Sequence, residues 1–123
     1  MYRPLPNQLT IRNSAIEGLG LFSEIKINKD SFIGVTHVKY ETFPNSYIRT
    51  PLGGFYNHSE NPNIIKMGMD IFPGYEFGKT LDLNSLSTIS KKNEKNFKYL
   101  FLVSLNDIDP GQELVAQYTF YQF

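Results

Sequence analysis

The sequence contains no cysteine and no tryptophan, and only two histidines, His37 and His58. Without cysteine the chain can form neither disulfides nor thiolate metal sites. With only two histidines, a metal centre would have to be rich in carboxylates. We therefore expect no metal cofactor.

The chain also has no excess of positive or negative charge, because 12 Lys and Arg residues balance 12 Asp and Glu residues. A protein that binds nucleic acid or an anionic membrane surface directly needs a basic excess. The composition therefore argues against both kinds of partner.

Long apolar runs are missing as well. The N-terminal stretch MYRPLPNQLTIRN lacks the continuous apolar segment of a signal peptide. No run approaches the ~20 apolar residues that span a bilayer. From this we expect a cytoplasmic protein.

The chain does have enough apolar residues for a core. It is 123 residues long, with 41% hydrophobic and 15% aromatic residues. A chain of this length can bury roughly two-thirds of the surface that its unfolded form exposes. These values predict one globular domain over residues 1–123.

Short segments rich in β-branched and apolar residues dominate the chain, and they predict strands. The clearest of them lie at 9–12, 21–27, 32–38 and 99–105. Turn-forming sequences at 28–30 and 109–111 separate strand candidates, and one short helix is expected at 83–89. The fold class expected is mainly β, built of many short strands.

The stretch GGFYNHSENPN at 53–63 combines glycine, proline and three asparagines with two adjacent aromatic rings. A surface turn uses the first three residue types, but it has little use for Phe55 and Tyr56. Taken alone, Asn57 could be a turn former and His58 a satisfied buried residue. A nucleophilic triad is poorly supported, because neither His58 nor Ser59 has an evident acidic partner in sequence.

Two further patches flank this stretch. The first, EGLGLF at 17–22, is either a tight turn or a place where a ligand can approach backbone amides. It is not a dinucleotide-binding fingerprint, which needs a third glycine and a following helix. The second, at 108–118, is a turn leading into a strand that ends on Tyr118. The aromatic tail at 120–123 is unusual for a chain end and predicts packing onto the domain, a ligand or a second subunit.

These three patches, in this order, resemble those of the SET-domain protein lysine methyltransferases. In size the chain is similar to the compact stand-alone members known from viruses and bacteria, and a viral protein would act inside the host cell. The resemblance extends from about Leu9 to Tyr118. It implies a SET-domain fold of several small sheets with a C-terminal pseudoknot. There the C-terminal segment threads past the segment around Asn57, an exception to the rule that chains avoid threading.

The resemblance also implies a site for the cofactor S-adenosylmethionine and a catalytic hydroxyl on Tyr118. The implied cofactor-binding residues are Glu17, Gly18, Leu19, Gly20, Phe55, Asn57 and His58. An apolar channel would receive the lysine of a protein or peptide substrate, and either the aromatic tail or a homodimer would complete it. The channel residues expected are Tyr56, His37, Phe120, Tyr121 and Phe123.

Methyl transfer to lysine suits such a channel. At pH 7 a lysine amine with a pKa near 10.4 is neutral in roughly one part in 2,500. An apolar environment and a neighbouring sulfonium cation both lower that pKa. The function expected is therefore S-adenosylmethionine-dependent lysine N-methylation.

Departures from the family pattern leave two alternatives open. Gly54 stands where Arg is frequent, Glu60 where Cys is frequent and Thr119 where Gly is frequent. The chain could instead be a SET-fold module with little or no activity that binds a peptide or partner protein. It could also be a structural β module that assembles through its aromatic tail.

Overall fold

The structure, a computed structural model, describes residues 5–40, 42, 47–82, 87–88 and 97–116. The regular structure in this part of the chain is nearly all short strands, together with one turn of 3-10 helix. They are β1 (Leu9–Asn13), β2 (Leu19–Ser23), β3 (Phe32–Lys39), β4 (Tyr47–Arg49), η2 (Pro51–Gly54), β5 (Asn57–His58), β6 (Ile64–Met69), β7 (Ser87–Thr88), β8 (Tyr99–Ser104) and β9 (Glu113–Ala116). No helix in the described residues has the length and apolar character needed to cross a bilayer.

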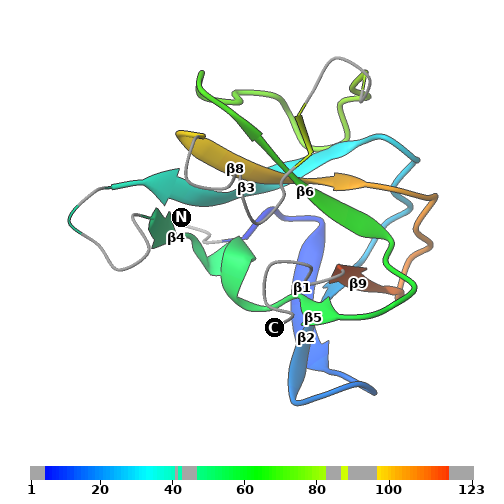
Figure 1. The fold of residues 1–123 in the computed structure, drawn as a ribbon. Coiled ribbons are helices and arrows are strands. Elements are labelled where there is room, and N and C mark those ends of the chain that lie inside the picture. The colour runs from blue at the N-terminus through cyan, green and yellow to red at the C-terminus, as the bar shows by residue number, and fades with distance from the viewer. Residues whose placement is uncertain (1–4, 41, 43–46, 83–86, 89–96, 117–123) are drawn as a thin grey trace.

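The strands form two small sheets (Figure 1). One has four strands in the order β1-β2-β9-β5, and the other has five in the order β4-β3-β8-β6-β7. Every described pair of neighbours is antiparallel except β5 and β9, which run parallel. The prediction of a mainly β fold made of small sheets is confirmed.

The core lies where the two sheets pack together. Strand β8 occupies the middle of the five-stranded sheet, and its successive side chains point to opposite faces. Leu102, fully buried, joins Leu9, Leu21 and Leu114 of the four-stranded sheet in one cluster. On the opposite face Phe101 packs in a second buried cluster. The apolar run predicted as a strand thus forms a strand buried on both faces.

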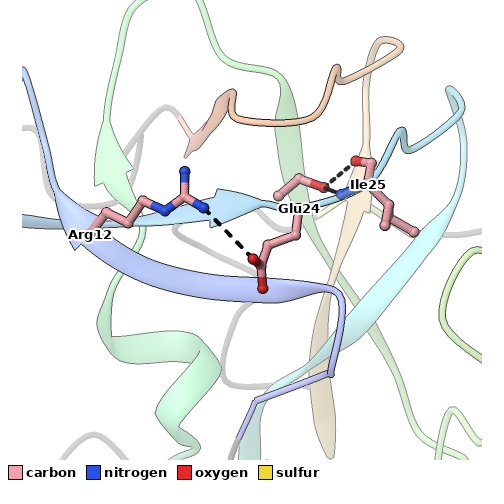
Figure 2. A network of polar contacts seen from close by, with 4 residues as sticks. Arg12, Glu24 and Ile25 are labelled. Carbon is pink, nitrogen blue, oxygen red and sulfur yellow. Dashed lines mark hydrogen bonds and ion pairs between the residues drawn. The ribbon is translucent and has the colours of Figure 1, made fainter.

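The predicted strand at 21–27 is too long, because the chain turns away from the sheet after Ser23. The Ser23 hydroxyl donates to the Ile25 carbonyl at 2.5 Å and accepts from the Ile25 N–H at 3.3 Å. Figure 2 shows this turn beside the ion pair of Arg12 and Glu24, whose Nη2 and Oε2 atoms lie 3.7 Å apart. Both ions are about half exposed, and such surface pairs contribute at most about 1 kcal/mol.

The prediction of a helix at 83–89 is wrong for Ser87 and Thr88, the two residues of that range that the structure describes. Ser87 and Thr88 form β7 and pair with Gly68 and Met67 at the edge of the five-stranded sheet. The other residues of that prediction lie outside the described part of the chain. A β-branched threonine favours an extended backbone, and the open edge of β6 supplies the hydrogen-bonding partners.

Candidate functional site

The four-stranded sheet brings the three sequence patches side by side. Strand β9, from the late patch, lies between β2 and β5. Strand β2 begins within the glycine loop, the name used below for residues 17–20 of the first patch, and β5 belongs to the middle patch. Leu21 pairs with Leu114 on one side of β9, and Asn57 pairs with Val115 on the other. In Figure 1 the three strands lie next to one another below the five-stranded sheet. Segments nearly 100 residues apart in sequence therefore share one site.

Asn57 ties the glycine loop to the sheet. Its Nδ2 atom donates to the carbonyl oxygens of Glu17 at 3.2 Å and Leu19 at 3.1 Å, and to Oε2 of Glu113 at 2.9 Å. Three converging acceptors fix which end of the amide is nitrogen. The Oδ1 atom makes no side-chain hydrogen bond with the described residues, so it remains able to accept one from a ligand.

Glu113 lies at the centre of this arrangement, a role that the sequence did not reveal. The Ser14 hydroxyl contacts both of its carboxylate oxygens, at 2.8 and 2.9 Å, and accepts from the backbone N–H of Ile16 at 2.9 Å. Ser14 and Glu113 are 99 positions apart, so no sequence spacing signals their contact.

The two glycines of the loop are needed for different reasons. At Gly20 an added Cβ would lie 2.8 Å from Cδ of Glu113 and 3.1 Å from Cβ of Ser14. Gly20 therefore makes room for the carboxylate. Gly18 has a φ of +49° and open space where a side chain would be, and both Gly18 and Leu19 are exposed residues. A ligand could therefore approach the loop at Gly18 and Leu19.

Asn63 holds the end of the middle patch against β9. Its side chain is only 6% exposed; Nδ2 donates to the carbonyl of Glu113 at 2.8 Å, and Oδ1 accepts from the N–H of Val115 at 2.8 Å. The N–H of Ser59 donates to the carbonyl of Ala116 at 2.9 Å. The segment around Asn57 thus lies against the last described strand, as a pseudoknot would require. The threading itself would involve residues outside the described part.

The two aromatic residues before Asn57 anchor the loop. Tyr56 is 8% exposed and belongs to the main core cluster. Phe55 is partly buried and packs against the same cluster. They follow η2, where Leu52 is also buried. The next two residues, Asn57 and His58, are both half-buried. The chain therefore emerges from the core after Tyr56.

His37 lies on β3 and is 9% exposed. Its Nδ1 atom is 2.8 Å from the hydroxyl of Thr36, which donates to the carbonyl of Leu100 at 3.2 Å. The imidazole packs edge-on against Tyr47, with ring centroids 5.9 Å apart. His37 is held by these contacts within the five-stranded sheet, and the structure does not test its predicted place in a substrate channel.

Burial lowers the pKa of His37 from 6.5 to about 3, with smaller contributions from Lys66 and Arg49. The unfolded chain binds a proton at this residue near pH 6.5, whereas the folded chain does not until about pH 3. Protonation therefore favours unfolding, and this group removes stability as pH falls from about 6.5 towards 3. The expected slope is at most about 1.4 kcal/mol per pH unit.

Urea unfolding of the wild type and of His37→Gln, followed from about pH 7 to about pH 4, measures this effect. Carboxylate titrations are common to both proteins and cancel in the comparison. The wild type should lose more stability than the variant over this range, and parallel curves would contradict the assignment.

Several predicted site residues lie outside the described residues, namely Tyr118, Phe120, Tyr121 and Phe123. Their roles stay predictions. Within the part of the chain that the structure describes, no three His, Cys, Asp or Glu side chains gather closely enough to hold a metal ion.

No protein-family model matches the chain, and no curated protein matches it in sequence. Among solved structures it is similar to the crystal structure of a Plasmodium falciparum protein described as a "putative histone methyltransferase". The two share 20% sequence identity over 93% of this chain and 95% of that one, with a TM-score of 0.60. At this identity the likeness establishes a shared fold. That fold, mainly β with small sheets, is consistent with the SET-like architecture predicted from the sequence.

Proposed function

We propose that the protein is an S-adenosylmethionine-dependent protein lysine N-methyltransferase. The observation that carries the proposal is the junction at Asn57, where the glycine loop, β5 and β9 meet through one side-chain amide. The shared fold with the Plasmodium protein supports a methyltransferase-like function.

The residues at this junction suit the methionine end of the cofactor. An ammonium group is a donor only, and Oδ1 of Asn57 is an acceptor still available to it. Gly18 and Leu19 are exposed, so a carboxylate could approach the chain there. His58 is the next residue of β5 and would lie beside the rest of the molecule.

When bound, the cofactor supplies an electrophilic methyl group on a positively charged sulfur. The chain's own contribution is to orient the acceptor amine and to keep it neutral. A wall that includes Tyr56 would disfavour the charged lysine by desolvation. The hydroxyl of Tyr118 would orient the amine lone pair towards the methyl group, which is mainly catalysis by proximity.

Removing the Asn57 side chain should weaken cofactor binding about 10- to 100-fold, the effect typical of losing a hydrogen bond to a charged group. Calorimetric titration of the full chain with S-adenosylmethionine and S-adenosylhomocysteine measures this effect. The wild type should bind each at one site, and Asn57→Ala should lose most of that affinity.

Asn61→Ala is a matched control for Asn57→Ala, because Asn61 lies in the same loop but is exposed. It should bind as the wild type does. No heat of binding at millimolar cofactor would refute the proposed function. Equal affinity of Asn57→Ala and Asn61→Ala would refute the role of Asn57 alone.

Core histones are a reasonable first acceptor to test, since the Plasmodium protein that shares the fold is described as a "putative histone methyltransferase". The test is transfer of a labelled methyl group from the cofactor, followed by identification of the modified residue. A panel of lysine peptides without histone sequences should be run beside them, because the balanced charge of the chain does not itself favour basic tails.

A further inference from the structure

Among the described residues, the carboxylate of Glu113 has only neutral partners. The groups that bond its side chain are the hydroxyl of Ser14 and the amide nitrogen of Asn57. Among the described residues no Lys, Arg or His nitrogen pairs with it, and Arg12 of β1 pairs with Glu24 instead. Neutral donors stabilise a carboxylate, but they leave its net charge in place.

The negative charge faces the glycine loop. The carboxylate fills the space that a side chain at Gly20 would need. One of its oxygens shares Nδ2 of Asn57 with the carbonyl oxygens of Glu17 and Leu19. A full negative charge and two carbonyl dipoles therefore converge on one amide nitrogen, and the two carbonyls belong to the residues on either side of Gly18. This part of the site is therefore electronegative, with no compensating cation among the residues that the structure describes.

We infer that Glu113 selects for a cationic ligand at the loop and so favours S-adenosylmethionine over S-adenosylhomocysteine. The inference rests on the proposed function. The two ligands differ by a methyl group and by one positive charge on sulfur. In the transfer, the lysine nitrogen forms a bond to the methyl carbon with its lone pair, and the electrons of the broken bond stay on sulfur. The positive charge passes to the amine, which releases a proton to solvent.

This change of charge gives Glu113 a role in turnover as a positioning residue that makes no contact with the reacting atoms. It attracts the charged substrate form of the cofactor and loses that attraction once the sulfur is neutral, which speeds release of the product. At an effective dielectric constant of about 20, a pair of unit charges roughly 10 Å apart changes affinity about tenfold. The effect should weaken as salt is added.

Glu113→Gln tests the inference because it removes the charge and nearly keeps the shape. We expect its ratio of Kd for S-adenosylhomocysteine to Kd for S-adenosylmethionine to fall about tenfold, chiefly through weaker S-adenosylmethionine binding. Glu113→Asp keeps the charge and should keep the ratio within about threefold. Glu24→Gln makes the same change in net charge at an exposed site and should leave the ratio unaltered.

A second measurement needs no variant and so does not depend on whether Glu113→Gln folds. An analogue with a titratable amine nitrogen in place of the sulfonium should bind the wild type about tenfold more tightly when protonated. Its affinity should therefore fall as pH rises through the pKa of the amine. An unchanged Kd ratio in Glu113→Gln, or pH-independent binding of the analogue, would overturn the selection by charge while leaving the proposed function intact. Failure of the wild type to bind either natural ligand would overturn both.

Discussion

A Tyr118→Phe variant is expected to keep its affinity for S-adenosylmethionine and to lose at least about 100-fold in the rate of methyl transfer. Strand β9 ends at Ala116, beside Asn57 and His58 of β5, and Tyr118 follows two positions later in the sequence. Under the proposed mechanism its hydroxyl orients the acceptor amine, and losing one oriented group at a reacting centre typically costs 10²- to 10³-fold. Labelled methyl transfer to one acceptor peptide gives the rate, and calorimetry gives the affinity.

Tyr75→Phe is the matched control for this experiment, because it removes a hydroxyl from an exposed ring that packs on Phe32 of the other sheet. It should be as active as the wild type. Full activity of Tyr118→Phe would show that the catalytic assignment is wrong. A wild-type protein that binds a partner peptide but transfers no methyl group would favour the non-catalytic SET-fold module instead.

Asn63→Ala is expected to lower the free energy of unfolding by about 3 kcal/mol. The substitution leaves the N–H of Val115 and the carbonyl of Glu113 without their partners on the Asn63 side chain. Each buried group left unsatisfied costs about 1–3 kcal/mol. Urea denaturation gives the change, provided that the denaturant dependence itself is unaltered.

Asn61→Ala provides the comparison for this experiment too, since Asn61 is exposed two positions earlier and its backbone N–H bonds to the hydroxyl of Ser59. It should change stability by less than about 0.5 kcal/mol. If the two alanine variants were equally stable, the side chain of Asn63 would not be what holds the loop against β9.

The amino-acid sequence by itself determined the strands whose residues carry a local signal. Runs rich in β-branched and apolar residues identified β1, β3 and β8 within a residue or two. The turns at 28–30 and 109–111 were also predicted from their residue types. Asp30 and Gly111 adopt the positive φ angles, +65° and +84°, that occur in such turns. These features depend on a few adjacent side chains and on backbone sterics, so neighbours in sequence suffice to predict them.

Strand β6 had no such signal and was not predicted. Lys66 and Gly68 interrupt its apolar run, yet both are buried in the structure, where β8 and β7 pair with the two edges of the strand. Its conformation follows from pairing with strands that lie far away in sequence. Context of this kind outweighs the propensities of the individual residues.

The candidate site divides in the same way. The sequence singled out the glycine loop and Asn57 as unusual stretches, through residue types that turns and ligand contacts require. It did not reveal Glu113, whose bonds to Asn57 and Ser14 span 56 and 99 positions. Those contacts exist only because β9 inserts between β2 and β5. The local sequence therefore indicated which residues could bind a ligand. The tertiary pairing of the strands decided that the carboxylate of Glu113 lies against Asn57 and Gly20.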